Sequence, residues 1–133
     1  VVVFDPKYSA STYMAEYLEM LAPYKDRVIL KFSGDSSWLF VEWKRAGLVT
    51  WGYGYQAWRT DSPDAWTSLL TDPSKDIISL HGPYSSEAWA EAIAVGKPLT
   101  AHILASRTEF DSAVTAGAVG AMVSAIGDWT PDV

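Results

Sequence analysis

The sequence contains no cysteine, which excludes a disulfide framework and any metal site built on cysteine ligands. No apolar run approaches the length of about 18 residues that a membrane-spanning helix needs. Basic residues are few, because 10 lysines and arginines stand against 16 aspartates and glutamates, for a net charge of -6. Without a basic stripe, a protein cannot neutralise a nucleic-acid backbone. We therefore expect no nucleic-acid partner and no transmembrane segment.

Two common catalytic patterns are also missing. Gly52-Tyr53-Gly54 follows an apolar run, but no third glycine opens a helix, which disfavours a nucleotide-binding loop. Ser33-Gly34-Asp35 lacks the nucleophile elbow of serine hydrolases. Neither nucleotide binding nor serine-hydrolase chemistry is indicated.

What the sequence does contain is an alternation of short apolar runs and helical segments. With 133 residues, 49% of them hydrophobic, the chain suffices for one domain, residues 1–133. Alternating strands and helices are typical of an α/β fold with a parallel sheet and helices outside it. Six strands are too few for a closed eight-stranded barrel, so we expect a partial (β/α)8 barrel. An open doubly wound sheet is the competing fold. The expected strands are Val1 to Phe4, Arg27 to Phe32, Gly47 to Gly52, Asp76 to Leu80, Pro98 to Leu104 and Val119 to Ser124.

Helix boundaries are marked by capping residues and glycines. The five expected helices start near Met14, at Ser36 or Ser37, at Ser62-Pro63, at Ser85 or Ser86, and at the capping box Ser106-Arg107-Thr108-Glu109. Gly47, Gly96 and Gly117 stand where left-handed residues end helices.

The first seven residues suggest a site. Val1 to Phe4 form an apolar run that ends in Asp5-Pro6-Lys7. Side chains alternate along a strand, so Asp5 and Lys7 project to the same side at its carboxyl end, where barrel folds place their chemistry. The two residues suit a metal ligand beside a phosphate-pairing cation. A plain salt bridge at a strand end explains them equally well.

Three further polar residues lie at or near the ends of expected strands. His81 and His102, the two histidines of the chain, are weak candidates for acid–base catalysis and better candidates for substrate contact. Lys31 interrupts an apolar strand and needs an anion, either a substrate phosphate or Asp35. If the Lys31 side chain instead points outward between helices, its ammonium group only reaches solvent and has no role in a site.

Aromatic residues are abundant, with seven Trp, seven Tyr and four Phe. Several fall near expected loops, where they would line a pocket for sugars or apolar ligands, and Trp51 is taken as a substrate-binding candidate. Packing between helices and sheet is the favoured alternative for the set as a whole. The set near loops is Trp38, Trp51, Tyr53, Tyr55, Trp58, Trp66 and Tyr84.

The order of strand ends resembles the C-terminal two-thirds of the glycerophosphodiester phosphodiesterases, a (β/α)8 barrel family. Three segments carry the resemblance. Val-Val-Phe-Asp5-Pro-Lys7 is similar to the third-strand motif of the family, and the run from Ile77 to Tyr84 is similar to its sixth-strand segment. The run from Gly96 to His102, followed by a capped helix and Ala116 to Met122, resembles the last two strands.

The resemblance implies a hydrolase that uses Ca²⁺ or Mg²⁺ to cleave glycerophosphodiesters or a related glycerol-phosphate polymer such as teichoic acid. Asp5 would take the place of a metal-ligating glutamate, and Lys7 that of a lysine on the substrate phosphate. Oxygen ligands suit such hard cations, and a lysine would offset the charge of the reacting phosphate. Together with the residues named above, the expected substrate contacts are Lys7, Lys31, His81, His102 and Trp51.

The sequence also departs from the family. The His-Arg-Gly and Glu-x-Asp motifs of its first strands would precede Val1, and its seventh-strand Trp-Thr-apolar-Asn appears here as His102-Ile103-Leu104-Ala105. The threonine-aspartate of its last strand appears as Val123-Ser124. We expect the residues of this chain alone to be inactive, with the other strands supplied by a preceding segment or another chain.

A second hypothesis stays open: a module of the same lineage that binds glycan, lipid headgroup or a protein partner without turnover. Phage tail and cell-surface proteins resemble this family, which favours that hypothesis and an extracellular or virion-associated location. The compartment itself is left undetermined by the sequence.

Overall fold

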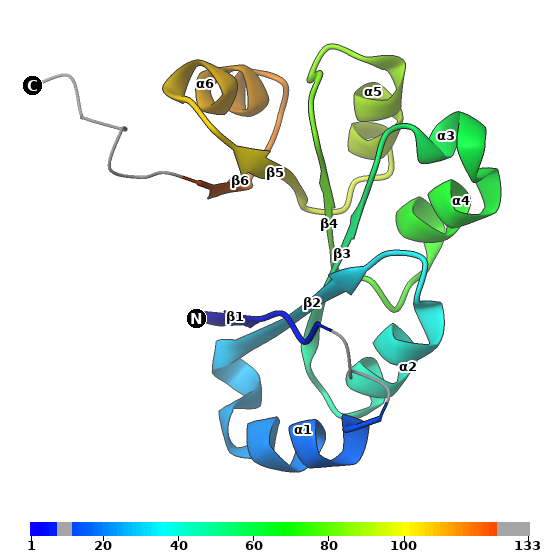
Figure 1. The fold of residues 1–133 in the computed structure, drawn as a ribbon, viewed down its shortest axis with the longest axis vertical. Helices are drawn as coiled ribbons and strands as arrows, with labels where there is room; N and C mark the ends of the chain where they lie inside the picture. Colours follow the sequence, from blue (N-terminus) through cyan, green and yellow to red (C-terminus); the bar gives the residue numbers. More distant parts are fainter. Residues whose placement is uncertain (8–11, 125–133) are drawn as a thin grey trace, which may run out of the picture.

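The structure, a computed structural model, describes residues 1–7 and 12–124. It is an α/β fold in which six parallel strands follow one another in sequence order across a single sheet. The sheet curls into half of a barrel, with helices on its outer side and a concave face that opens to the left in Figure 1. This confirms the predicted partial barrel. The strands are β1 (Val2–Phe4), β2 (Val28–Ser33), β3 (Val49–Gly54), β4 (Ile77–Leu80), β5 (Leu99–Leu104) and β6 (Gly120–Val123).

Five of the helices that connect these strands begin close to the predicted signals, and η1 and α3 are additional. They are α1 (Met14–Leu21), the 3-10 helix η1 (Ala22–Arg27), α2 (Ser37–Arg45), α3 (Trp58–Asp61), α4 (Pro63–Thr71), α5 (Glu87–Ala94) and α6 (Arg107–Thr115). Gly47, Gly96 and Gly117 adopt positive φ angles of 80°, 78° and 102°, as expected after helix ends. None of the described helices is both long and apolar enough to cross a bilayer.

The serine caps are only partly as predicted. The Oγ atoms of Ser86 and Ser106 accept hydrogen bonds from the backbone N–H groups of Trp89 and Glu109, at 3.1 and 3.2 Å. The second hydrogen bond of the predicted capping box is shifted by one residue. The Glu109 carboxylate accepts from the backbone N–H of Ala105 and not from that of Ser106. Ser62 precedes α4 without a side-chain cap bond. Pro63 occupies the first position of α4 and has no backbone N–H, so this helix has one fewer N–H group that needs a partner.

The convex face of the sheet buries two apolar clusters against the helices. One joins Leu30 of β2 to Phe40 and Trp43 of α2. The other packs Ile78 and Leu80 of β4 against α4, α5 and α6. Near-continuous apolar strands fit this arrangement, because a parallel sheet covered by helices buries one face completely.

Strand β3 supplies both faces of the sheet with unusual residues. Its sequence Trp51-Gly52-Tyr53-Gly54 alternates rings with glycines, so the rings share the concave face and the glycines face the helices. A Cβ atom on Gly54 would lie 2.5 Å from Leu69 Cδ2 and 2.8 Å from Trp58 Cζ3. The glycines therefore let α3 and α4 pack directly onto the backbone of β3.

We predict that Gly54→Ala lowers the free energy of unfolding by about 1–3 kcal/mol, because the added methyl overpacks the Leu69–Trp58 contact. Gly120→Ala is the matched control, since its Cβ would lie 3.4 Å from Thr100 Cγ2, an ordinary contact. Chemical denaturation followed by tryptophan fluorescence measures both. Equal stability of the two variants would contradict the close packing of α3 and α4 on β3.

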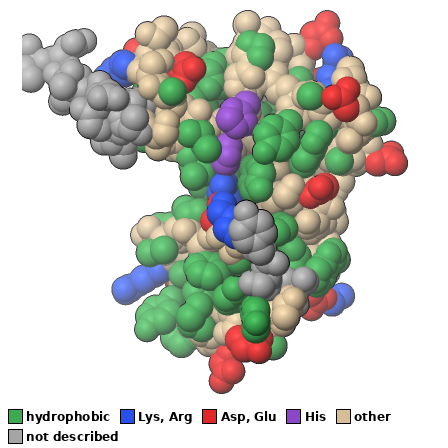
Figure 2. All heavy atoms as spheres, viewed as in Figure 1, with side chains coloured by type: hydrophobic (Ala, Val, Ile, Leu, Met, Phe, Trp, Pro, Cys, Tyr) green, Lys and Arg blue, Asp and Glu red, His purple; other side chains and the backbone are tan. Residues whose placement is uncertain are grey.

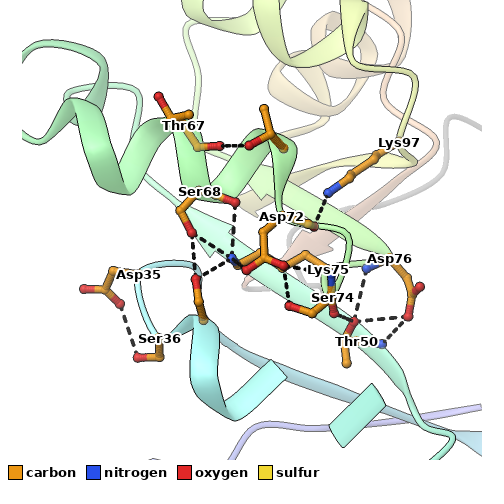
Figure 3. A network of polar contacts seen from close by, with 12 residues as sticks. Asp35, Ser36, Thr50, Thr67, Ser68, Asp72, Ser74, Lys75, Asp76 and Lys97 are labelled. Carbon is orange, nitrogen blue, oxygen red and sulfur yellow. Dashed lines mark hydrogen bonds and ion pairs between the residues drawn. The ribbon is translucent and has the colours of Figure 1, made fainter. Parts of the chain in front are cut away.

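A buried lysine ties three convex-side segments together (Figure 3). Lys75, 1% exposed, donates to Asp72 Oδ2 at 2.8 Å, to Ser68 Oγ at 3.1 Å and to Ser37 Oγ at 3.2 Å. Its side chain also lies over the ring of Phe40, 5.1 Å from the centroid. Burial lowers the pKa of Lys75, and Asp72 opposes that shift. The lysine thus links α2 and α4 to the segment that enters β4.

Asp72 is the charged partner on which this network depends. Burial alone would raise the pKa of Asp72, but hydrogen bonds from Lys75 and Ser74 outweigh it and hold the pKa well below its usual range. A carboxylate with a depressed folded pKa stabilises the protein above its unfolded pKa of about 4 and loses that contribution as the pH falls.

We predict that Asp72→Asn lowers the free energy of unfolding by about 3 kcal/mol at pH 7, because it leaves the Lys75 ammonium buried without its counter-charge. The variant also loses part of the acid sensitivity below about pH 4. Denaturation curves at several pH values measure both effects. The control Asp111→Asn breaks an exposed pair with Arg107 and is expected to cost less than about 1 kcal/mol. Equal costs for the two variants would refute the role given to Asp72.

Candidate functional site

The ends of β1 and β2 bring three charged groups together on the concave face. Lys7 Nζ lies 2.6 Å and Lys31 Nζ 3.1 Å from the same Asp5 oxygen, Oδ2. The register of the strands explains the contact. Val3 pairs with Ile29, and two positions further along each strand, on the same face, stand Asp5 and Lys31. Lys31 is 2% exposed, whereas Lys7 is largely open to solvent. Two ammonium groups around one carboxylate leave one net positive charge.

Four rings continue the site from Lys31 across β3, β4 and β5. Lys31 Nζ lies 4.6 Å from the centroid of the Tyr53 ring, and that ring stacks on His102 with centroids 5.2 Å apart. His102 meets His81 edge to face at 5.1 Å, and His81 stacks on Tyr55 at 5.9 Å. Figure 2 shows the histidine side chains directly above lysine side chains in the hollow of this face. We call Asp5, Lys7, Lys31, Tyr53, Tyr55, His81 and His102 the concave-face cluster.

The electrostatics of this cluster keep His102 neutral near pH 7. Burial, followed by the positive charge of Lys31, lowers the pKa of His102 to about 4, and Asp5 opposes the shift only in part. Burial and the Asp5 carboxylate raise the pKa of Tyr53, so its phenol stays protonated. The cluster therefore presents cations at one end and aromatic rings, among them a neutral His102 and a protonated Tyr53, at the other.

Polar atoms without partners gather on the same face. Among residues 1–7 and 12–124, five buried side-chain polar atoms have no hydrogen-bond partner, and four of them belong to concave-face residues. Strand register places Trp51 beside Lys31, and Ser79 beside Tyr53. Buried polar atoms are normally paired, so this concentration indicates a surface suited to a polar ligand. The four atoms are Asp5 Oδ1, Trp51 Nε1, Ser79 Oγ and His102 Nδ1.

The predicted site residues lie on one face, although the partner of Lys31 differs from the prediction. Lys31 pairs with Asp5 and not with Asp35, one of its two predicted partners, and it does not point outward among the helices. The other predicted partner, a substrate phosphate, stays a prediction. Asp35 instead accepts a hydrogen bond from Ser36 at 3.4 Å. The predicted substrate contacts Lys7, His81, His102 and Trp51 all occupy the concave side or its upper rim, and their role in binding stays a prediction.

Tyr53 and Tyr55 were predicted only as two of several aromatics near loops, and not as residues of the site. The missed signal is the period-two spacing of Trp51, Tyr53 and Tyr55, which follows from the glycines between them. Ending the predicted strand at Gly52, and so leaving Tyr53 and Gly54 outside it, hid this pattern. The strand in fact runs from Val49 to Gly54, two residues later than predicted at each end.

Of the other aromatics near predicted loops, Trp66 and Trp58 pack in or against the core, as the alternative interpretation held. Trp38 is exposed and Tyr84 stands beside Trp89, with ring centroids 4.9 Å apart. The aromatic content therefore divides between helix packing and the concave face.

The described residues around Asp5 do not fit a divalent cation. Its Oδ2 already accepts from two ammonium groups, whose charge opposes a metal ion, and it is the one carboxylate of the concave-face cluster. Within residues 1–7 and 12–124, no group of three or more histidine or acidic side chains is arranged to hold a metal. The Ca²⁺ or Mg²⁺ implied by the resemblance stays a prediction, and no step below passes through a metal.

Comparison of the chain with protein-family models, curated proteins and solved structures finds no match. The similarity to glycerophosphodiester phosphodiesterases stays a hypothesis that depends on the three motifs described above.

We predict that the His102 imidazole titrates near pH 4 in the folded protein and that Lys31→Met moves this pKa upward, because a neighbouring positive charge is removed. Imidazole nitrogen shifts in a two-dimensional NMR titration report the change. Lys25→Met, in η1 before β2, is the control and is expected to leave the pKa unchanged. A His102 pKa above 6 in the unmodified protein would refute the buried, cation-facing environment.

Proposed function

We propose that the concave-face cluster binds the phosphate of a phosphodiester of glycerol or another polyol, and that the chain is part of a phosphodiesterase. The observation that carries this proposal is the pair of ammonium groups of Lys7 and Lys31 on one oxygen of Asp5. A phosphodiester carries one negative charge, which matches the one net positive charge of these three groups. A buried ammonium also interacts more strongly with an anion than an exposed one does.

The rings of the cluster extend the contact beyond the charges. His102 has an unpartnered buried Nδ1 and, in its neutral form, offers one donor and one acceptor nitrogen. An anion bound beside His102 would raise its pKa, because negative charge stabilises the imidazolium form. At acidic pH, close to the His102 pKa of about 4, binding would then be accompanied by partial proton uptake. This supports a substrate-contact role for His102.

A second candidate function is a binding module of the same lineage without turnover. The observation that favours it is the engagement of Asp5 by two lysines, which leaves the concave-face cluster without a carboxylate available as a general base. The rings of Trp51, Tyr53 and Tyr55 would serve ligand contact in either case.

We predict that the full-length protein binds dimethyl phosphate and hydrolyses a chromogenic phosphodiester. Lys7→Ala and Lys31→Met each reduce binding by about tenfold or more, since each removes a charge-assisted hydrogen bond. Lys25→Ala is the control, because this lysine precedes β2 and lies at the opposite end of the strand.

The outcomes separate the two candidates. Binding together with hydrolysis that falls in Lys7→Ala supports the phosphodiesterase. Binding that depends on both lysines without any hydrolysis supports the module. No binding of dimethyl phosphate by the full-length protein would overturn both.

A further inference from the structure

Tyr53 of β3 stands at the centre of the concave-face cluster. In the strand register, its neighbours are Ser33 of β2 and Ser79 of β4, whose small side chains leave room on this face for the tyrosine ring. Tyr53 belongs to neither of the two apolar clusters that join the described helices to the sheet. Packing of the core therefore does not explain why a large ring occupies this position.

The ring of Tyr53 contacts a charged group and an imidazole. Lys31 Nζ lies 4.6 Å from the ring centroid, and His102 stacks on the ring with centroids 5.2 Å apart and planes inclined by 13°. The strand order places β2 on one side of β3 and β5 on the other side, beyond β4. The ring thus stands between the two side chains, with Lys31 reaching it from β2 and His102 from β5.

The ring, and not the phenol, makes these contacts. Within residues 1–7 and 12–124, the side chain of Tyr53 meets Lys31, His102 and Tyr55 through its ring. The face of an aromatic ring carries negative partial charge, which attracts an ammonium group. A phenylalanine ring at this position would offer the same attraction.

Lys31 needs such a support because it shares its carboxylate. Asp5 Oδ2 lies 3.1 Å from Lys31 Nζ and 2.6 Å from Lys7 Nζ. A lysine ammonium is carried on a flexible four-carbon stem, which loses rotamer freedom when a ligand fixes it. The Tyr53 ring restricts the Lys31 ammonium before a ligand arrives, so less freedom is lost on binding and the affinity rises.

We propose that Tyr53 is a positioning residue of the phosphate site: its ring holds the Lys31 ammonium in place for the anion, and the stack with His102 holds the ring. The proposal depends on the proposed function and adds to it a residue that acts through Lys31. The affinity for an anion then depends on the ring of Tyr53 and not on its hydroxyl group.

The test measures the affinity of the full-length protein for dimethyl phosphate by isothermal titration calorimetry. We expect Tyr53→Leu to weaken binding about fivefold, because the contact between ring and ammonium is lost, and Tyr53→Phe to restore it to within about twofold. In the Lys31→Met background, Tyr53→Leu is expected to change the affinity by less than about twofold, since the residue through which Tyr53 acts is already absent. Tyr24→Leu is the control, because Tyr24 is 58% exposed and lies in η1, before β2.

The pattern of effects separates positioning from a structural role. A loss in Tyr53→Leu that Tyr53→Phe restores, and that disappears in the Lys31→Met background, supports the proposal. Unchanged affinity in Tyr53→Leu, or an equal loss with and without Lys31, overturns it while the phosphate site stands. Failure of the unaltered protein to bind dimethyl phosphate overturns the proposed function itself. Far-UV circular dichroism checks that each variant is folded, and Tyr53→Met takes the place of Tyr53→Leu if the latter is not.

A second measurement tests the contact without any ligand. Protons above the face of an aromatic ring resonate upfield, so we expect the Cε protons of Lys31 to lie upfield of those of the exposed lysines in NMR spectra. The shift should persist in Tyr53→Phe and vanish in Tyr53→Leu. Its absence from the unaltered protein would refute the placement of the Lys31 ammonium over the ring.

Discussion

The burial of the Lys31 ammonium on the concave face is the constraint on which the rest of the site depends. An ammonium at 2% exposure is stable only if an anion or a ring offsets the loss of water. Asp5 supplies the anion and Tyr53 the ring. The ion pair joins β1 to β2 at the level of the side chains, in addition to the backbone ladder. Burial of the imidazole and then this same positive charge hold His102 in its neutral form.

Strand β3 shows how one local pattern serves both packing and the site. Gly52 and Gly54 remove side chains from the convex face, which lets Leu69 and Lys75 approach the backbone. The intervening positions, Trp51 and Tyr53, place their rings on the concave face without competing for that space. The alternation couples the two faces, since a shift of register by one residue would bury the rings under α4 and turn the glycines toward the site.

The sequence predicts the order and type of the main elements because hydrophobic runs, helix caps and left-handed glycines are local signals. Gly47, Gly96 and Gly117 are clear examples, since their φ angles depend on the adjoining helix end. The short helix α3 was not predicted, because four residues carry no periodic pattern. The end of β3 was misplaced because a glycine in sequence usually indicates a turn. In β3, Gly54 instead makes room for the side chains of Trp58 and Leu69, which the sequence of the strand alone does not reveal.

The sequence predicts which residues of the site lie at strand ends, but it does not predict which of them contact one another. His81, His102, Asp5 and Lys7 follow from strand direction, but the choice of Asp5 over Asp35 as the partner of Lys31 depends on the register between β1 and β2. Two acids at similar positions cannot be ranked without that register. The ring contacts also depend on strand register, because the stacking of Tyr53 on His102 joins β3 to β5 across β4.

A comparison of the two buried lysines shows why the concave face is the better candidate for ligand binding. Lys75, on the convex side, has a carboxylate of its own in Asp72 and oxygen acceptors in Ser37 and Ser68. Lys31 shares its single carboxylate with Lys7, and its other contact among the described residues is the face of Tyr53. Both ammonium groups are equally removed from water, yet only Lys75 has a full set of oxygen partners. The difference leaves Lys31 with capacity to bind a further oxygen anion, which is the property that a phosphate-binding site requires.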